Sequence, residues 1–362
     1  MRVLILANYD VGLYKFRKEL LEELLKEHEV YVSLPVGIYT QELKDMGCHF
    51  IETEFDRHGT NPVQELKQIG EYRKILRQVE PDIVFTYTIK PNVYGGMACA
   101  AAKIPYVVNI TGLGTALENP GIMQKITLVL YRLGLRKAQK VFFQNTENRD
   151  FMLKHHAVKG AYDLLPGSGV NLNQYEASEY PMKNTVDFVF VGRMMKEKGI
   201  ENYLETAEYI RKKYPETRFH ICGSYEQDYS ERLEKLQKDE VVIYHGTVKD
   251  MASVYKEISC IIHPTYYPEG LSNVLLESAA SARPIITTDR SGCREVIDCG
   301  VNGFICKQKD TEDLIKQVEA FLALSREERK AMGLAGRKKV EKEFDRQIVI
   351  QKYLQEIAYI KR

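Results

Sequence analysis

Residues 187–199 read DFVFVGRMMKEKG, and this stretch decides the fold. Phe188–Val191 is an apolar run of the length expected for a buried strand, and Gly192 ends it where a strand-to-helix turn would open. Similar short apolar runs alternate with amphipathic stretches on both sides of it, which is the pattern of βαβ units with a parallel sheet. The chain is therefore expected to be an α/β protein.

Two series of such units divide the chain. Strands are predicted at 2–7, 29–34, 83–86, 106–110 and 141–144, and then again at 187–191, 218–222, 241–244, 260–263 and 284–287. A length of 362 residues suits two domains. We place a first domain at 1–168, a Gly- and Pro-containing linker at 169–181 and a second domain at 182–346.

A last helix, at 347–362, either completes the second domain or crosses back to the first. Two doubly wound domains are expected to leave a cleft where strand ends from both sides meet one ligand.

Composition excludes several classes of protein. A net charge of +1 gives no reason to expect nucleic acid as a partner. The seven cysteines include no C-x-x-C pair, which favours reduced thiols in a cytoplasmic protein. The N-terminus runs directly into a predicted strand, and no apolar run approaches the roughly 20 residues of a membrane span.

Two carboxylates, Glu269 and Glu277, lie eight residues apart around the start of a helix predicted over 271–282. A helix N-terminus offers unpaired N–H groups and a partial positive charge, which together hold phosphate. Glutamates on either side of a bound diphosphate would meet the sugar at one end and the ribose at the other. This segment indicates a nucleotide-sugar site.

Two cations, Arg193 and Lys198, follow the strand that ends at Gly192. Arginine can grip a phosphate with two hydrogen bonds, and lysine adds a compact charge. Cations of this kind would stabilise a diphosphate as it leaves during sugar transfer. Taken alone, the segment is better explained as an ordinary basic loop, and the carboxylate pair some seventy residues later is what favours a diphosphate site.

Taken in order and spacing, these two motifs resemble the retaining glycosyltransferases of family 4, which have the GT-B fold of two Rossmann-like domains facing a cleft. The resemblance implies that Arg193 and Lys198 bind the donor diphosphate, that Glu269 contacts the donor hexose, and that Glu277 contacts the ribose. Arg193, Lys198 and Glu269 are then the residues closest to the chemistry. It also implies donor contacts from the backbone at the neighbouring positions Gly192, Gly270, Leu271, Ser272 and Asn273.

Other donor positions are predicted less tightly. Gly223 follows a predicted strand and permits close backbone approach. Val248 belongs to a segment resembling the one that reads the base in this family. Both positions are also explained as simple strand-to-helix turns.

The first domain departs from the family pattern. Where relatives often have a Gly-Gly pair after the first strand, this chain has Gly12 alone, and Thr111 stands where many have a histidine. A third candidate acceptor contact is Lys90, which precedes a predicted helix and is otherwise a surface lysine. We therefore name no general base. A dinucleotide-binding G-x-G-x-x-G is absent, which argues against an oxidoreductase.

The stretch 121–140 is the candidate for membrane contact. Leucines and other apolar residues alternate in it with five cations, Lys125, Arg132, Arg136, Lys137 and Lys140, and no acid. A basic amphipathic helix can lie in a bilayer interface and attract anionic lipid. The alternative is a domain helix that packs its leucines on the sheet.

These observations predict a retaining hexosyltransferase that moves a hexose or N-acetylhexosamine from a UDP sugar to a glycan hydroxyl, with a polyprenyl-diphosphate-linked acceptor favoured. It would work in the cytoplasm, at the inner face of the membrane. No metal cofactor is expected, because the chain contains no Asp-x-Asp and the cations could replace the metal. The alternatives are a sugar-nucleotide epimerase, a phosphorylase-like enzyme and a non-catalytic nucleotide-sugar binding protein.

Overall fold

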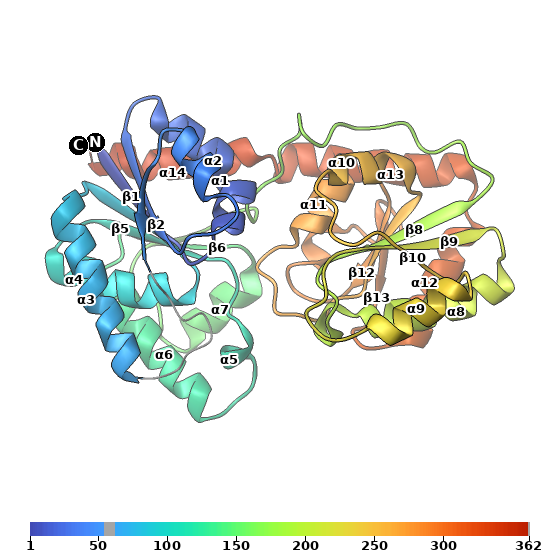
Figure 1. The fold of residues 1–362 in the computed structure, drawn as a ribbon, viewed down its shortest axis with the longest axis horizontal. Coiled ribbons are helices and arrows are strands. Elements are labelled where there is room, and N and C mark those ends of the chain that lie inside the picture. The colour runs from blue at the N-terminus through green and yellow to red at the C-terminus, as the bar shows by residue number, and fades with distance from the viewer. Residues whose placement is uncertain (54–61, 361–362) are drawn as a thin grey trace. The chain divides into compact units, whose positions relative to one another are not determined.

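The computed structural model describes residues 1–53 and 62–360 (Figure 1). They form two compact units, the first made of Met1–Gly169 and Gln347–Arg362 and the second of Val170–Arg346. Each unit contains one sheet in which every neighbouring pair of strands is parallel.

The sheet of the first unit has the order β3-β2-β1-β4-β5-β6-β7. The chain order therefore reverses between β1 and β4, which defines the switch point where ligands bind in doubly wound sheets. Its elements are β1 (Arg2–Leu6), α1 (Asp10–Leu25), β2 (Glu29–Leu34), α2 (Thr40–Asp45), β3 (His49–Glu52), α3 (Pro62–Val79), β4 (Ile83–Tyr87), the π-helix η1 (Pro91–Gly95), α4 (Gly96–Ala102), β5 (Tyr106–Ile110), α5 (Thr115–Glu118), α6 (Ile122–Leu135), β6 (Lys140–Phe143), α7 (Thr146–Lys154), β7 (Tyr162–Leu164) and α14 (Arg346–Ile360).

Side chains of the central strand β1 alternate between two apolar cores. Leu4 and Leu6 pack on the face covered by α3, α4 and α6. Val3 and Ile5 pack on the other face, which α1 and α14 cover. A strand that is buried on both faces consists of a continuous apolar run, which is why β1 could be predicted from the sequence.

The second sheet has the order β10-β9-β8-β11-β12-β13, so its switch point lies between β8 and β11. Its unit contains β8 (Val186–Val191), the 3₁₀-helix η2 (Lys196–Lys198), α8 (Ile200–Lys213), β9 (Thr217–Cys222), α9 (Ser230–Lys238), β10 (Ile243–Tyr244), α10 (Met251–Glu257), β11 (Cys260–His263), α11 (Asn273–Ala280), β12 (Ile285–Thr288), the 3₁₀-helix η3 (Arg294–Val296), β13 (Gly303–Cys306), α12 (Thr311–Ala323) and α13 (Arg326–Glu343).

Helix α14 packs on the first unit, beside β1 in Figure 1. Its apolar side chains Val349, Ile350 and Ile357 join the core on the α1 face. The Tyr353 hydroxyl accepts a hydrogen bond of 2.7 Å from the side-chain amide of Asn109 in β5. Of the two alternatives for this helix, the structure has the one that returns to the first unit.

The linker predicted at 169–181 is wrong for all but its first residue, because residues 170–181 belong to the second unit. Arg283 is fully buried and donates to the carbonyl oxygens of Ser178 at 3.1 Å and Glu179 at 2.8 Å. The N–H groups of a buried guanidinium need hydrogen-bond acceptors, so these bonds hold the segment 170–181 against the second unit.

Candidate functional site

The predicted donor residues gather at the switch point of the second sheet. Arg193 and Lys198 lie in the segment that follows β8, and Glu269 lies in the segment that follows β11. Because the carboxyl ends of parallel strands meet at the same edge of the sheet, neighbouring strands present these segments together.

The charged side chains form a compact cluster around Tyr267. Lys198 Nζ pairs with Glu269 Oε1, and the two side chains are only 14% and 17% exposed. Arg193 pairs with Glu226 at 3.0 Å. The Arg193 guanidinium and the Lys198 ammonium lie 5.9 Å and 5.0 Å from the Tyr267 ring centroid. The aromatic ring attracts both cations through cation–π interaction.

Glycines let the loops of this edge pass very close to one another. A side chain at Gly199, which has φ +76°, would collide with the carbonyl oxygen of Pro264. A side chain at Gly223 would collide with the carbonyl oxygen of Gly192. The space above Gly223 is thus filled by protein backbone, so this glycine is required for packing between the ends of β8 and β9.

Helix α11 begins at Asn273, two residues later than predicted, because Leu271 is buried in the core instead of opening the helix. Ser272 precedes the first turn, and its N–H donates to the carbonyl oxygen of Gly292 at 2.8 Å. The Ser272 N–H thus has a protein partner, whereas for Leu271 it is the side chain that is committed to the core. Backbone contacts of both residues with phosphate stay predictions. Gly270 lies in the turn before them, next to Gly292.

Glu277 is the fifth residue of α11, so it lies little more than one turn into the helix. Its Oε2 accepts a hydrogen bond of 3.3 Å from the Tyr255 hydroxyl. Burial raises the pKa of both Tyr255 and Tyr175, and the Glu277 carboxylate raises each further. The two phenols therefore stay protonated and can hold the carboxylate in one orientation. Sequence reasoning missed both tyrosines.

His263, the last residue of β11, lies behind the helix start. It is buried, and its Nε2 and the Ser272 hydroxyl are 3.2 Å apart. Burial, with the charge of Lys198, lowers the pKa of His263 to about 3. The imidazole is thus neutral at physiological pH and braces the turn without adding charge.

Val248 lies beyond β10 and is half-buried, packed against the core that contains Leu271. Its side chain supports the same edge of the sheet. A base-reading role for its backbone stays a prediction.

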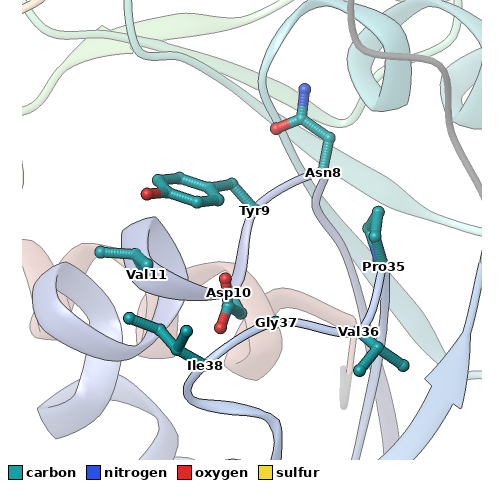
Figure 2. Close-up of a pocket in the computed structure, with 8 residues that line it drawn as sticks. All are labelled: Asn8, Tyr9, Asp10, Val11, Pro35, Val36, Gly37 and Ile38. Carbon is teal, nitrogen blue, oxygen red and sulfur yellow. The ribbon is translucent and has the colours of Figure 1, made fainter. Parts of the chain in front are cut away.

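A pocket of about 360 Å³ opens at the matching edge of the first unit. Figure 2 shows it between the loops that follow β1 and β2. Asp10 is buried there and accepts a hydrogen bond of 2.6 Å from the N–H of Tyr39, and a side chain at Gly37 would collide with its carboxylate. Tyr9, Val36 and Ile38 leave apolar surface exposed at this pocket.

The three predicted acceptor contacts are spread over this unit. Gly12 lies in the first turn of α1 and not in a loop, because the helix begins at Asp10. Lys90 is half-buried and precedes η1, after β4. Thr111 is half-buried and follows β5. Both Lys90 and Thr111 therefore lie at the carboxyl edge of the sheet.

Helix α6 carries an exposed apolar stripe. Five residues spaced along one side of it are between 47% and 77% exposed: Ile122, Met123, Ile126, Val129 and Leu133. Leu128, Tyr131 and Leu135 on its other side are buried in the core. The helix thus packs one side on its own domain, as one of the two alternatives predicted, and leaves an apolar stripe exposed on the other side. Membrane contact by that stripe stays a prediction.

The cations predicted for this region separate into two groups. Lys125, Arg132, Arg136 and Lys137 are exposed, and Arg132 donates to the carbonyl oxygen of His155 at 2.7 Å. Lys140 is the first residue of β6 and pairs with Glu356 of α14 at 3.4 Å. Lys140 therefore already has an acid partner, and its membrane contact stays a prediction.

Among residues 1–53 and 62–360, no helix is both long enough and apolar enough to cross a membrane. Within the same residues, no group of three or more His, Cys, Asp or Glu side chains could hold a metal ion.

Two doubly wound parallel units, with cations and a carboxylate at one switch point, define an enzyme of the GT-B class. The chain belongs to the glycosyltransferases: residues 175–339 match the family Glycosyl transferases group 1, and residues 2–145 match Glycosyl transferase 4-like. The resemblance and the fold predicted from the sequence are confirmed.

Relatives match between about four fifths and nearly all of the chain. The N,N'-diacetylbacillosaminyl-diphospho-undecaprenol alpha-1,3-N-acetylgalactosaminyltransferase of Campylobacter jejuni is 26% identical, over 98% of this chain and 97% of its own. The capsular polysaccharide biosynthesis glycosyltransferase CapM of Staphylococcus aureus is 31% identical, over 79% of this chain and 78% of its own. The crystal structure of Anabaena HepE in complex with UDP and glucose has a TM-score of 0.82 and 16% identity, over 99% of this chain and 100% of that one.

Proposed function

We propose that this protein is a retaining hexosyltransferase that moves a hexose or N-acetylhexosamine from a UDP sugar to a hydroxyl of a polyprenyl-diphosphate-linked glycan. The single observation that carries the proposal is the cluster of Arg193, Lys198 and Glu269 at the switch point of the second sheet. Two cations and one carboxylate match the charges of a sugar diphosphate and the hydroxyls beside it.

In this mechanism, Arg193 and Lys198 bind the donor diphosphate, Glu269 accepts hydrogen bonds from the hexose, and Glu277 accepts them from the ribose. Lys198 would exchange its contact with Glu269 for the phosphate, which frees Glu269 for the sugar. Cations fixed beside the leaving group stabilise the charge that develops on it.

Transfer with retention needs no protein nucleophile in this scheme. The bond between the anomeric carbon and the phosphate oxygen breaks, and a bond from that carbon to the acceptor oxygen forms on the same face. The acceptor's proton passes to the leaving phosphate oxygen. The protein contributes orientation, charge and exclusion of water.

The names of relatives support the choice of substrates. The Campylobacter relative is named for a diphospho-undecaprenol acceptor, and the HepE structure holds UDP and glucose. In the first unit, we assign the acceptor sugar to the pocket shown in Figure 2, with Lys90 and Thr111 at the same edge of the sheet. Tyr9 would stack on a sugar ring there.

We also propose that α6 rests on the cytoplasmic face of the membrane. Its apolar stripe would enter the interface, and the exposed cations Lys125, Arg132, Arg136 and Lys137 would meet anionic headgroups. A membrane-bound acceptor would then be delivered to a membrane-bound enzyme.

The test is a transfer assay with UDP-glucose, UDP-galactose and their N-acetyl forms, on a short-chain prenyl-diphosphate glycan. Product with the donor's anomeric configuration is expected, and it should disappear in Lys198→Ala. An inverted product would overturn the retaining mechanism. Turnover of the UDP sugar without any acceptor would instead favour an epimerase, and release of a sugar phosphate would favour a phosphorylase.

A further inference from the structure

A second pocket of the first unit lies between α4 and α6, away from the carboxyl edge of the sheet. It has a volume of about 340 Å³ and is lined by Met97, Ala100, Ala101, Lys103, Leu133, Arg136 and Lys137. Neither the donor site nor the acceptor pocket of Figure 2 shares a residue with it.

Three cations surround this α4–α6 pocket. Lys103, Arg136 and Lys137 are all exposed, and no Asp or Glu is among the lining residues. In the part of the chain that the structure describes, none of the three forms an ion pair. The surrounding sequence is equally one-sided, with seven Lys and Arg and a single acid, Glu118, over residues 83–146. Such a concave surface concentrates positive potential and attracts an anion.

The rest of the pocket is apolar. Met97 and Leu133 contribute long hydrophobic side chains, and the alanines leave room beside them. Leu133 is also the last residue of the exposed stripe on α6, so the pocket and the stripe form one continuous surface. A ligand that uses both parts must carry a negative group next to hydrocarbon.

The positive surface continues on the far side of α4. A neighbouring pocket of about 390 Å³ also touches Ala101 and is lined by Arg73 and Arg77 of α3. Cations on both sides of this end of α4 raise the positive electrostatic potential at Ala101, and none of them belongs to the donor site.

We propose that the α4–α6 pocket binds the phosphate of an anionic phospholipid, with the start of its acyl chains on Met97 and Leu133. Charge complementarity and continuity with the apolar stripe favour this occupant. The proposal rests on the membrane contact proposed for α6, and it adds a defined headgroup site to it. That site would fix which way the first unit faces on the bilayer.

The experiment measures flotation of the full-length protein with vesicles of phosphatidylcholine alone or with added phosphatidylglycerol. Replacing Lys103, Arg136 and Lys137 together by Ser should weaken binding to phosphatidylglycerol vesicles on the order of 100-fold, since each cation near an anionic surface strengthens binding roughly fivefold and the three effects multiply. The matched control replaces three exposed lysines of the second unit, Lys212, Lys235 and Lys238, and should leave binding nearly unchanged.

A charge-neutral variant separates a built site from general attraction. Ala101→Trp fills the pocket at an exposed position and keeps every cation. It should abolish saturable binding of dihexanoyl phosphatidylglycerol, measured below the micelle concentration, and leave the melting temperature unchanged. Dihexanoyl phosphatidylcholine should bind neither protein.

The outcomes test the membrane contact of α6 and the headgroup site separately. If the unmodified protein binds no vesicle, the membrane contact of α6 is wrong and the headgroup site falls with it. If it binds phosphatidylglycerol vesicles but Ala101→Trp binds them equally well, the headgroup site alone is wrong. If glycerol 3-phosphate binds as tightly as the short lipid, the apolar part contributes nothing and the lipid assignment is overturned.

Discussion

Replacing Glu269 by Gln should change nucleotide binding and turnover in opposite directions. In the unliganded site Lys198 pairs with Glu269, and both side chains are largely buried. A diphosphate must therefore take Lys198 away from a carboxylate. Glu269→Gln leaves Lys198 with a neutral oxygen, which is a weaker competitor.

The size of the effect follows from the contact. A hydrogen bond to a charged group contributes about 1.5–3 kcal/mol, and a neutral one about half as much. Binding of UDP should then improve by about 1 kcal/mol, which is roughly fivefold in Kd. Turnover should fall at least 100-fold, because the hexose loses the carboxylate that orients it.

Isothermal titration calorimetry gives the Kd for UDP, and single-turnover transfer from the UDP sugar gives the rate of turnover. Glu226→Gln is the matched control for the sugar contact, since it neutralises the carboxylate that pairs with Arg193 and removes no proposed contact to the hexose. Weaker UDP binding by Glu269→Gln would refute the exchange of Lys198 between carboxylate and phosphate. Unchanged turnover would refute the sugar contact.

Four further predictions follow from the site. Arg193→Ala and Lys198→Ala should each lower turnover by about 10²–10³-fold, as expected for groups that stabilise a leaving charge, and normal rates in both would contradict the diphosphate assignment. Glu277→Ala should weaken UDP binding about tenfold through the lost ribose contact, whereas an unchanged Kd by titration would contradict that role. The pKa of His263 in the folded state is about 3, below its unfolded value, so the unfolded chain binds more protons in acid. The free energy of unfolding should therefore fall by up to about 1.4 kcal/mol per pH unit as pH drops from about 6.5 towards 3. Urea unfolding of His263→Gln at the same pH values should lack this component. Activity should persist in excess EDTA, and a loss that magnesium or manganese restores would show that the cations do not replace a metal.

Central strands could be predicted well because burial on both faces leaves a continuous apolar run. The structure has β11 at Cys260–His263, the predicted bounds, and β8 one residue longer than predicted. Edge elements could not be predicted in this way. The missed strands β3, β7 and β13 have only three or four residues each and include half-exposed positions, so their pairing depends on neighbours distant in sequence.

The same distinction holds in the candidate site. Arg193, Lys198 and Glu269 could be assigned to one site, because they follow predicted parallel strands and such strands end at the same edge of a sheet. The hydrogen bond of the Ser272 N–H could not be predicted, since its partner is the carbonyl oxygen of Gly292, on a different loop. The ion pair of Lys140 could not be predicted for a similar reason: its acid partner, Glu356, is more than two hundred residues away in the sequence.

The return of α14 to the first unit affects how the protein is made. Val349, Ile350 and Tyr353 fill the core next to Val3 and Ile5, yet they are translated only after the whole second unit. At about 5–20 residues per second, the ribosome leaves that face of the first unit uncovered for roughly ten to thirty-five seconds. The second unit, continuous in sequence, can fold during this time. A fragment ending at Gly169 would keep the gap permanently and should aggregate through it.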